Sequence, residues 1–191
     1  MKAVSHRVGL TTEIVMDTAM KIADKEGLGQ LTLSRIAEEL GVRTPSLYEH
    51  VEGLDGLIKH LRLKGFRLLS QQLQRSVIGV SGDDAIRGFA DSFRHFVKEH
   101  PAVYSLTVES DIRDGEEIQS AAEEIIDTIQ AVLKSYGIDK EQLVHATRYL
   151  RSVMHGFISL EMFGGFGLKV SIDESFDLIK EAIISNMKGG F

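Results

Sequence analysis

Apolar residues recur along most of the chain at intervals of three and four positions, which is the spacing of one buried face of an α-helix. No run of alternating apolar and polar residues stands out that would predict a β-strand. Together with the residues that favour helix ends, this pattern predicts an all-α protein of about nine helices. The helices are expected to begin at Thr11 or Thr12, Leu33, about Thr44, about Leu54, Ser81, about residue 102, Glu116, Asp139 and Ser171.

Several of the expected helix ends carry residues whose chemistry suits that position. Pro101 should stop the helix that precedes it, because proline disfavours helical backbone in the residue before it. Asp139 is followed three positions later by Gln142, and Ser171 by Glu174. This is the spacing of a capping box, in which side chain and backbone satisfy each other's free donors. These residues therefore predict where the last helices begin.

Residues 33–51 carry the most informative pattern. A short helix is followed by Gly41, where a turn requires a positive φ, and then by a second short helix whose first turn tolerates Pro45. Ala37 is small where the two helices would cross closely. Apolar residues occupy the positions that two crossed helices need for a shared core: Ile36, Leu40, Val42, Leu47 and Val51. The complete set, in register, predicts a helix-turn-helix.

The residues left outside this core are short hydrogen-bonding groups rather than the Glu and Lys pairs typical of a solvated helix face. They lie at the start and on the exposed face of the second short helix: Arg43, Thr44, Ser46, Tyr48 and His50. The major groove of DNA admits a helix, whose N-terminal part reads base edges while flanking donors hold phosphates. The alternative interpretation is a helical hairpin that belongs to an ordinary bundle.

This stretch resembles the DNA-binding domain of the TetR family of bacterial regulators over about residues 8–60. The resemblance rests on Thr32, Ile36-Ala37, Leu40-Gly41-Val42 and Leu47-Tyr48-Glu49-His50. It implies a DNA-binding domain over residues 1–53 and a helical regulatory and dimerisation domain over residues 54–191.

The resemblance also implies roles for individual residues. Tyr48 and His50 would contact phosphates, and Arg7 would belong to an arm that approaches the duplex. Arg43, Thr44 and Ser46 would face bases or nearby backbone. The expected DNA-binding set is Arg7, Thr32, Arg43, Thr44, Pro45, Ser46, Tyr48 and His50.

One position departs from the family pattern. TetR regulators usually place a lysine at the start of the helix that follows the helix-turn-helix, where it meets a phosphate, and this chain has Leu54 there. Glu52 and Asp55 add negative charge nearby. Each lost phosphate contact should lower the salt dependence of DNA binding by about one logarithmic unit. We expect modest affinity, or a phosphate held by free N–H groups at the start of that helix.

Two C-terminal segments are too apolar for helices that keep one face in water. Residues 139–163 carry two apolar stripes, and the helix that begins at Ser171 carries another. The family resemblance implies that two such helices from each of two chains form a four-helix interface. The expected interface residues are Arg151, His155, Ile158, Met162, Phe176, Ile179 and Ile183. The alternative is that both helices are simply internal core.

Residues 151–157 resemble the WHG-type C-terminal domain found in some TetR regulators, with Met154 in place of the tryptophan that gives the domain its name. His155 within this run is expected to be an interface histidine, with a pH or ligand contact as the alternative.

A sensor pocket would need an apolar, aromatic lining with a few polar anchors. The candidates for such a pocket are Phe89, Phe93, Phe96, Tyr104, Val108 and Phe157, with Arg113 or Arg148 as anchors. A small apolar or amphipathic effector bound there would act by changing the separation of the two DNA-reading heads. The alternative is that these aromatic residues are plain core.

Composition narrows the remaining choices. The net charge of −6 argues against a nonspecific nucleic-acid coat, and residues 1–62 are nearly neutral, with eight basic and nine acidic residues. The absence of cysteine excludes thiol catalysis and cysteine-ligated zinc. The histidines have no metal-binding spacing, and no nucleophile lies beside a candidate base. No catalytic residue, metal or cofactor is therefore predicted.

The sequence thus predicts a homodimeric regulator that binds a near-palindromic DNA operator. No membrane span and no secretory signal is predicted, so the protein is expected in the cytoplasm. Repression relieved by the effector is the expected mode of action. The competing interpretation is a helical protein–protein adaptor that has lost DNA binding, which the acidic balance and Leu54 favour.

Overall fold

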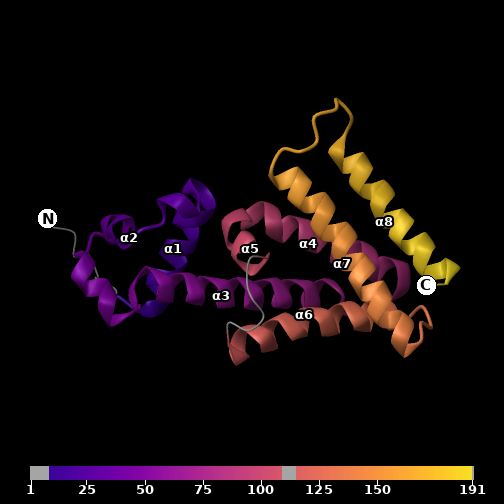
Figure 1. The fold of residues 1–191 in the computed structure, drawn as a ribbon, viewed down its shortest axis with the longest axis horizontal. Helices are drawn as coiled ribbons and strands as arrows, with labels where there is room; N and C mark the ends of the chain where they lie inside the picture. The colour runs from indigo at the N-terminus through magenta and orange to yellow at the C-terminus, as the bar shows by residue number, and fades with distance from the viewer. Residues whose placement is uncertain (1–8, 109–114, 191) are drawn as a thin grey trace, which may run out of the picture.

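The computed structural model describes residues 9–108 and 115–190, and every regular element within those ranges is a helix. The all-α prediction is confirmed. The elements in chain order are α1 (Thr12–Glu26), η1 (Leu28–Gln30), α2 (Leu33–Leu40), η2 (Thr44–Glu49), α3 (Gly53–Ser76), α4 (Gly82–Glu99), α5 (Pro101–Val108), α6 (Glu116–Lys134), α7 (Lys140–Met162) and α8 (Ile172–Gly189), where η marks a 3-10 helix. Figure 1 shows α1 and α2 at one end of the long α3, with the later helices around its other part.

We call residues 9–61 the head and the remaining described residues the body. Side-chain hydroxyls cap the first two α-helices of the head, α1 and α2. Thr11 accepts a hydrogen bond from the N–H of Ile14 at 3.2 Å, and Thr32 accepts one from the N–H of Arg35 at 3.1 Å. Each cap satisfies one of the N–H groups that a helix start leaves without a partner. The threonines therefore fix where α1 and α2 begin.

The turn of the helix-turn-helix has the geometry that its glycine predicts. Gly41 is left-handed, with φ 65° and ψ 30°, and its N–H donates to the carbonyl of Glu38 at 3.1 Å. The N–H of Val42 donates to the carbonyl of Ala37 at 3.0 Å. These bonds close α2 and send the chain directly into η2.

The second short helix differs from the expected α-helix. Residues Thr44–Glu49 form a 3-10 helix, whose hydrogen bonds span three residues, as from the N–H of Ser46 to the carbonyl of Arg43 at 2.9 Å. Only at its end does a four-residue bond form, from Val51 to Leu47 at 3.0 Å. Pro45 supplies no N–H to the first turn, and so short an element gains little from α-helical bonding.

An ion-pair cluster fastens α2 to the end of α1. The guanidinium of Arg35 donates to both carboxylate oxygens of Glu26, at 2.7 and 3.1 Å, and lies 2.9 Å from Glu39. Beneath this cluster lies a compact head core, in which Ile36, Leu47 and Leu57 are each fully buried. The pairs orient the two helices, and the apolar core supplies most of the stability.

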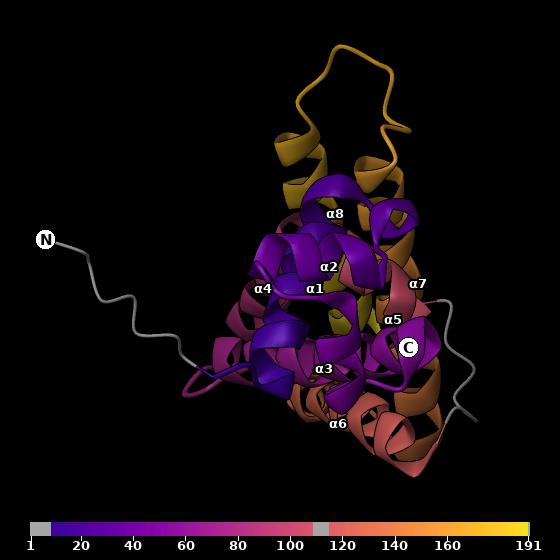
Figure 2. The same cartoon turned by 90° about the vertical axis from the view of Figure 1, so that its left-hand side faces the viewer.

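The body is arranged around α3, which packs against α4, α5 and α6. Figure 2 views the molecule from the head end, with α6 on one side of α3 and the connection between α7 and α8 projecting on the other. Phe89, Phe96 and Phe176 are the largest fully buried side chains of this core. Asp139 and Ser171 cap α7 and α8 as predicted, each accepting backbone hydrogen bonds of 2.9 to 3.2 Å.

Helix α5 belongs to both parts of the molecule. Val103 and Leu106 complete the head core, while Tyr104 lies in the body core. Gly65 of α3 allows this close approach, because a Cβ atom there would stand 2.6 Å from Cγ1 of Val103. The short helix therefore packs tightly on α3 where head and body meet.

A carboxylate of the head holds the start of α5. Oδ1 of Asp24, at the end of α1, accepts hydrogen bonds from the N–H groups of Ala102 at 3.1 Å and Val103 at 3.3 Å. Its other oxygen, Oδ2, lies 2.8 Å from the ring of His100. Asp24 thus caps the start of α5 although it belongs to α1, and these hydrogen bonds couple the position of α5 to that of α1.

Candidate nucleic-acid interface and effector cavity

The face of η2 turned away from the head core is open to solvent. Arg43, Ser46 and Tyr48 are exposed, and Tyr48 keeps 61% of its surface. Between them, Leu47 is fully buried and Val51 is 3% exposed. The apolar residues fix the helix in the head, and the polar residues project from a firm base. This is the arrangement that a reading helix needs.

Arg43 is the cation available to a ligand at this surface. Within the described ranges no ion pair includes it, whereas Arg35 is engaged by Glu26 and Glu39. A guanidinium in this position can contact a phosphate or pair with guanine through two hydrogen bonds. The head carries five basic and nine acidic residues, and Arg43 gives it a localised positive group on this face.

The other predicted DNA-binding residues lie around this face. Pro45 is exposed, Thr44 is half-buried, and Thr32 is exposed while its oxygen caps α2. His50 is half-buried, with Nδ1 3.5 Å from the hydroxyl of Thr12. Arg7 lies outside the described residues.

The start of α1 also belongs to this face, which the sequence analysis did not predict. Thr12 is exposed and contacts His50, so the first turn of α1 lies beside the end of η2. The only sequence signal was two adjacent threonines at a helix start, which are equally typical of a cap.

The start of α3 fits the expected departure from the family pattern. Leu54 is exposed there, and Glu52 makes no side-chain capping bond to α3. The first N–H groups of this helix are thus left to solvent or to an anion, as the positive end of a helix dipole favours. Asp55 in the first turn opposes that attraction.

A cavity of about 310 Å³ lies within the body. It is bounded by five helices, α3 to α7, and most of its lining is apolar. The apolar lining residues are Phe66, Leu69, Phe89, Phe93, Val108, Ala122, Ile125, Ile126, Ile129 and Met154, and the polar ones are Tyr104, Thr107, Arg151 and His155. A largely apolar cavity with a few convergent polar groups is typical of a small-molecule site.

The polar groups of this cavity lie on α5 and α7. The hydroxyl of Tyr104 and Nδ1 of His155 are 2.7 Å apart. Burial raises the pKa of the Tyr104 hydroxyl, which therefore stays protonated and can donate a hydrogen bond to Nδ1 of His155. Burial, and then the charge of Arg151, lower the pKa of His155. In the tautomer that accepts this bond at Nδ1, the neutral ring carries its own proton at Nε2 and can donate it in a second hydrogen bond.

Four of the residues predicted for an effector pocket lie together in the wall of this cavity. Phe89, Phe93, Tyr104 and Val108 line the cavity. Phe96 is absent from its wall because it is buried elsewhere in the core, at 1% exposure.

Two further predicted pocket residues need correction. Arg148 is exposed away from the cavity wall, and Phe157 packs at a tilted angle against Phe166 and Phe176 elsewhere in the body. Arg113 lies outside the described residues. The polar wall comes instead from Arg151 and His155, which the sequence interpretation had assigned to a dimer interface.

The remaining predicted interface residues divide by burial. Ile158, Phe176 and Ile183 are at most 1% exposed within the single chain, so their side chains have no surface to offer a second copy. These three are core residues of the body, as the alternative interpretation held. Met162 and Ile179 are half-buried and keep some free surface.

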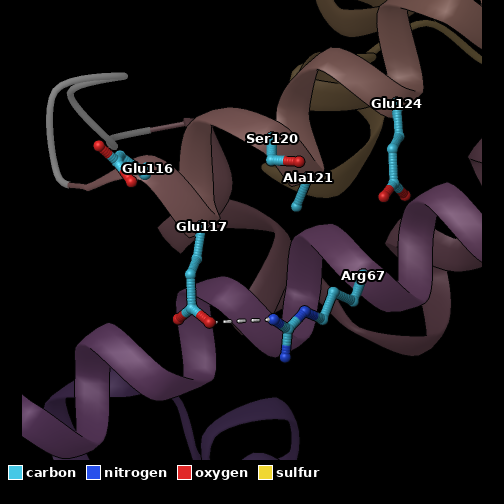
Figure 3. A pocket seen from close by; sticks show the side chains of 6 residues that line it. All are labelled: Arg67, Glu116, Glu117, Ser120, Ala121 and Glu124. Carbon is cyan, nitrogen blue, oxygen red and sulfur yellow. Dashed lines mark ion pairs between the residues drawn. The ribbon is translucent and has the colours of Figure 1, made fainter.

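A second hollow, of about 270 Å³, lies between α3 and α6 (Figure 3). Arg67 points from α3 toward Glu117 of α6, with a nitrogen–oxygen distance of 3.5 Å. Glu116 and Glu124 also line it. Five of the six residues that line this hollow are polar and three of them are glutamates, so the largely apolar cavity bounded by α3 to α7 is the better candidate site for a small molecule.

No group of three or more His, Asp or Glu side chains in residues 9–108 and 115–190 is placed to hold a metal ion. No helix in the same part of the chain is long and apolar enough to cross a membrane.

A helix-turn-helix head with an open polar face, joined to a helical body that encloses a cavity, defines a DNA-binding transcriptional regulator. Residues 15–61 match the family described as bacterial regulatory proteins, tetR family. Residues 86–183, about half of the chain, match the tetracyclin repressor-like C-terminal domain. The chain belongs to the TetR family, and both halves of the resemblance seen in the sequence are confirmed.

Individual proteins agree with this assignment. The chain is 32% identical to the uncharacterized HTH-type transcriptional regulator YobS of Bacillus subtilis, covering 96% of this chain and 95% of that protein. It is 33% identical to the uncharacterized HTH-type transcriptional regulator Rv0681 of Mycobacterium tuberculosis, covering 86% and 76%. The fold is similar to that of the Streptomyces coelicolor TetR family protein ActR in complex with (S)-DNPA. That similarity has a TM-score of 0.65 at 18% identity and covers 95% and 98% of the two chains.

Proposed function

We propose that this regulator is a homodimeric repressor that binds a near-palindromic operator and leaves it when a small molecule enters the cavity. The observation that carries this proposal is the double role of α5. Val103 and Leu106 pack in the head core, while Tyr104 and Thr107 of the same eight-residue helix line the cavity. A ligand that moves α5 would therefore move the head.

DNA recognition in this proposal is divided among the residues of η2. Arg43 and Ser46, near the start of the helix, read bases or the adjacent backbone, and Tyr48 contacts a phosphate. His50 supports the same phosphate contact, held in place by Thr12. Free N–H groups at the start of α3 substitute for the lysine that Leu54 replaces.

Release requires the ligand to prefer one of two arrangements of the protein. Occupation of the cavity would push on Tyr104 and Thr107, and Asp24 would pass the movement of α5 to α1 through its bonds to Ala102 and Val103. In a dimer, such a movement changes the distance between the two heads, which must equal the spacing of the operator half-sites. ActR, a TetR family protein of similar fold, has been solved in complex with (S)-DNPA, which is consistent with ligand binding in this chain.

Dimerisation is proposed through α7 and α8, on surfaces that remain open in the single chain. Leu178 is 72% exposed, and Ala182 and Ser185 continue the same exposed helix face at intervals of four and three residues. The large exposed side chain of Leu178, with two small side chains beside it, forms a surface on which a second helix can pack closely. Met162 and Ile179 keep their predicted place at this interface.

The function is tested by a mobility-shift assay with the purified chain and the promoter of its own gene. The wild-type chain should retard the fragment, and Arg43→Ala and Tyr48→Ala should each weaken binding by about tenfold or more. Arg75→Ala is the matched control, because Arg75 is an exposed arginine in the last turn of α3, far from the head. A protein that folds but never retards the fragment would support the adaptor alternative.

Oligomeric state is tested by sedimentation at micromolar concentration. The wild-type chain should sediment as a dimer, and Leu178→Glu should shift the equilibrium strongly to monomer, since it buries an unpaired charge at the interface. Ile78→Glu is the matched control, because Ile78 is 75% exposed and lies between α3 and α4, outside the two proposed interface helices. A wild-type monomer would contradict the dimer.

A further inference from the structure

The polar end of the cavity holds hydrogen-bond donors without protein acceptors. Arg151 lines the wall, and within the described ranges none of its nitrogens takes part in an ion pair or hydrogen bond. His155 is engaged at Nδ1 by Tyr104, and in the same part of the chain its Nε2 has no partner. Both residues lie on α7 at positions i and i+4, so the two side chains share one face of the helix.

The charge of the lining favours a ligand of negative sign. Among the described lining residues, Arg151 is the only one that is permanently charged, and none is Asp or Glu. A cationic ligand would therefore meet Arg151 and, within the described wall, no carboxylate to balance it. A neutral ligand would offer these donors only neutral hydrogen bonds, whereas an anionic oxygen would accept stronger, charge-assisted hydrogen bonds from both.

The rest of the wall sets the character of the ligand's body. Phe66, Leu69 and Phe89 are nearly fully buried, and they line the cavity together with Ile125, Ile129 and Met154. A cavity of about 310 Å³ is at the small end of ligand sites in proteins. The ligand body is therefore compact and apolar.

We propose that the effector is a small amphipathic carboxylate, whose carboxyl group binds Arg151 and His155 and whose apolar body occupies the space between α3, α4 and α6. This inference rests on the proposed function of the cavity as an effector site. The carboxylate accepts hydrogen bonds from the Arg151 guanidinium and from Nε2 of His155. Its binding would join α7 to the Tyr104 side of α5 through the existing bond to His155.

Calorimetric titration of the full-length protein tests the ligand class without DNA. The probes are hexanoate, octanoate, decanoate and 3-phenylpropanoate, each compared with its primary amide and its primary amine. In at least one set the carboxylate should bind about tenfold more tightly than the amide, because a charge-assisted hydrogen bond is replaced by a neutral one. The amine should bind more weakly than either.

Variants assign the effect to the cavity. Arg151→Gln should lower the affinity for the best carboxylate about tenfold, to that of its amide, while the affinity for the amide is unchanged. Arg148→Gln is the matched control, because Arg148 is an exposed arginine three residues earlier on α7, outside the cavity wall. Ala122→Phe should abolish binding of carboxylate and amide alike by filling the cavity, with circular dichroism as a check that the chain remains helical.

Three results would overturn the inference: no probe binds, amides equal or exceed carboxylates in every set, or Arg151→Gln leaves carboxylate affinity unchanged. Operator release, measured separately, distinguishes this failure from failure of the proposed function. Carboxylates that bind but release no DNA would leave the ligand class standing and contradict release. If only amides release the DNA, the proposed release mechanism stands and the carboxylate ligand class is contradicted.

Discussion

The head and the body use burial in opposite ways. In the head, a closed apolar core supports a row of polar side chains that point outward, as Leu47 supports its neighbours Ser46 and Tyr48. In the body, the core is hollow, and Tyr104 and His155 point polar atoms inward to the cavity. A surface that reads a large rigid partner needs a firm support, whereas a site that surrounds a small molecule needs space inside the protein.

The comparison also explains how strongly each part tolerates change. The head core is small, so each buried side chain carries a large share of its stability. The cavity leaves lining residues such as Phe93 and Ile126 partly exposed, so the body can accept altered side chains there. The difference is sharpest at α5, whose residues serve both cores.

The largest expected effect is in the head. Leu47→Ala removes a fully buried side chain beneath the reading face and should lower the free energy of unfolding by about 2 to 5 kcal/mol. Chemical denaturation followed by circular dichroism measures the loss. Tyr48→Ala is the control, because removal of its exposed ring should change stability by no more than about 0.5 kcal/mol. Equal losses in the two variants would contradict the division between support and reading face.

The joint between head and body should respond next. Gly65→Ala places a Cβ atom 2.6 Å from Cγ1 of Val103, and overpacking of this kind costs about 1 to 3 kcal/mol. Thermal unfolding of the single variants and of Gly65→Ala with Val103→Ala forms a double-mutant cycle. A favourable coupling energy is expected, since the second change removes the clash. Strictly additive effects would show that α3 and α5 do not meet there as described.

A smaller effect is expected where Asp24 holds α5. Asp24→Ala leaves the N–H groups of Ala102 and Val103 without their acceptor, and loss of a cap costs about 0.5 to 2 kcal/mol. Coupling between ligand and DNA should weaken as well, which a mobility-shift titration with the best carboxylate measures. Asp17→Ala is the control, because its pair with Lys64 is more exposed and should contribute about 0 to 1 kcal/mol.

The smallest effect is a pH dependence of the body. Burial, followed by the charge of Arg151, lowers the pKa of His155 in the folded protein. The unfolded chain therefore binds a proton at higher pH than the folded chain does, and stability falls as pH decreases through 6.5, the ordinary value, toward the lower folded pKa.

Below the folded pKa the loss is complete and stability no longer changes on account of this group. His155→Asn should flatten the fall in melting temperature over that range, whereas His145→Asn, at an exposed position of the same helix, controls for removal of a histidine. A steeper fall in His155→Asn would reverse the sign and contradict the assignment.

The head was more predictable from sequence than the body. The turn at Gly41 and the apolar positions around it are set by spacing within twenty consecutive residues, so register alone identifies which side chains face outward. The 3-10 winding of η2 was not predicted, because the same spacing fits an α-helix over so short a stretch.

The cavity is lined by residues of five helices, and these residues are far apart in the chain. Sequence spacing identified aromatic residues such as Phe89 and Phe93 as apolar, but gave no means of separating a cavity wall from solid core, as the burial of Phe96 shows. His155 and Tyr104 are fifty-one positions apart, and only packing brings them together. For the same reason, Ile158 and Ile183 were predicted as interface residues although the chain covers them itself.

Helix α5 has only eight residues, so the positions that contact the cavity and the positions that contact the head are close neighbours in the chain. Val103 and Leu106 are constrained by the head, and Tyr104 and Thr107 by whatever the cavity holds. Under the proposed function, a change of residues in α4, α6 or α7 could therefore alter the inducer while DNA recognition by the head stays the same. Different ligands could then control the same DNA-binding head, because only a short helix connects the cavity to the head.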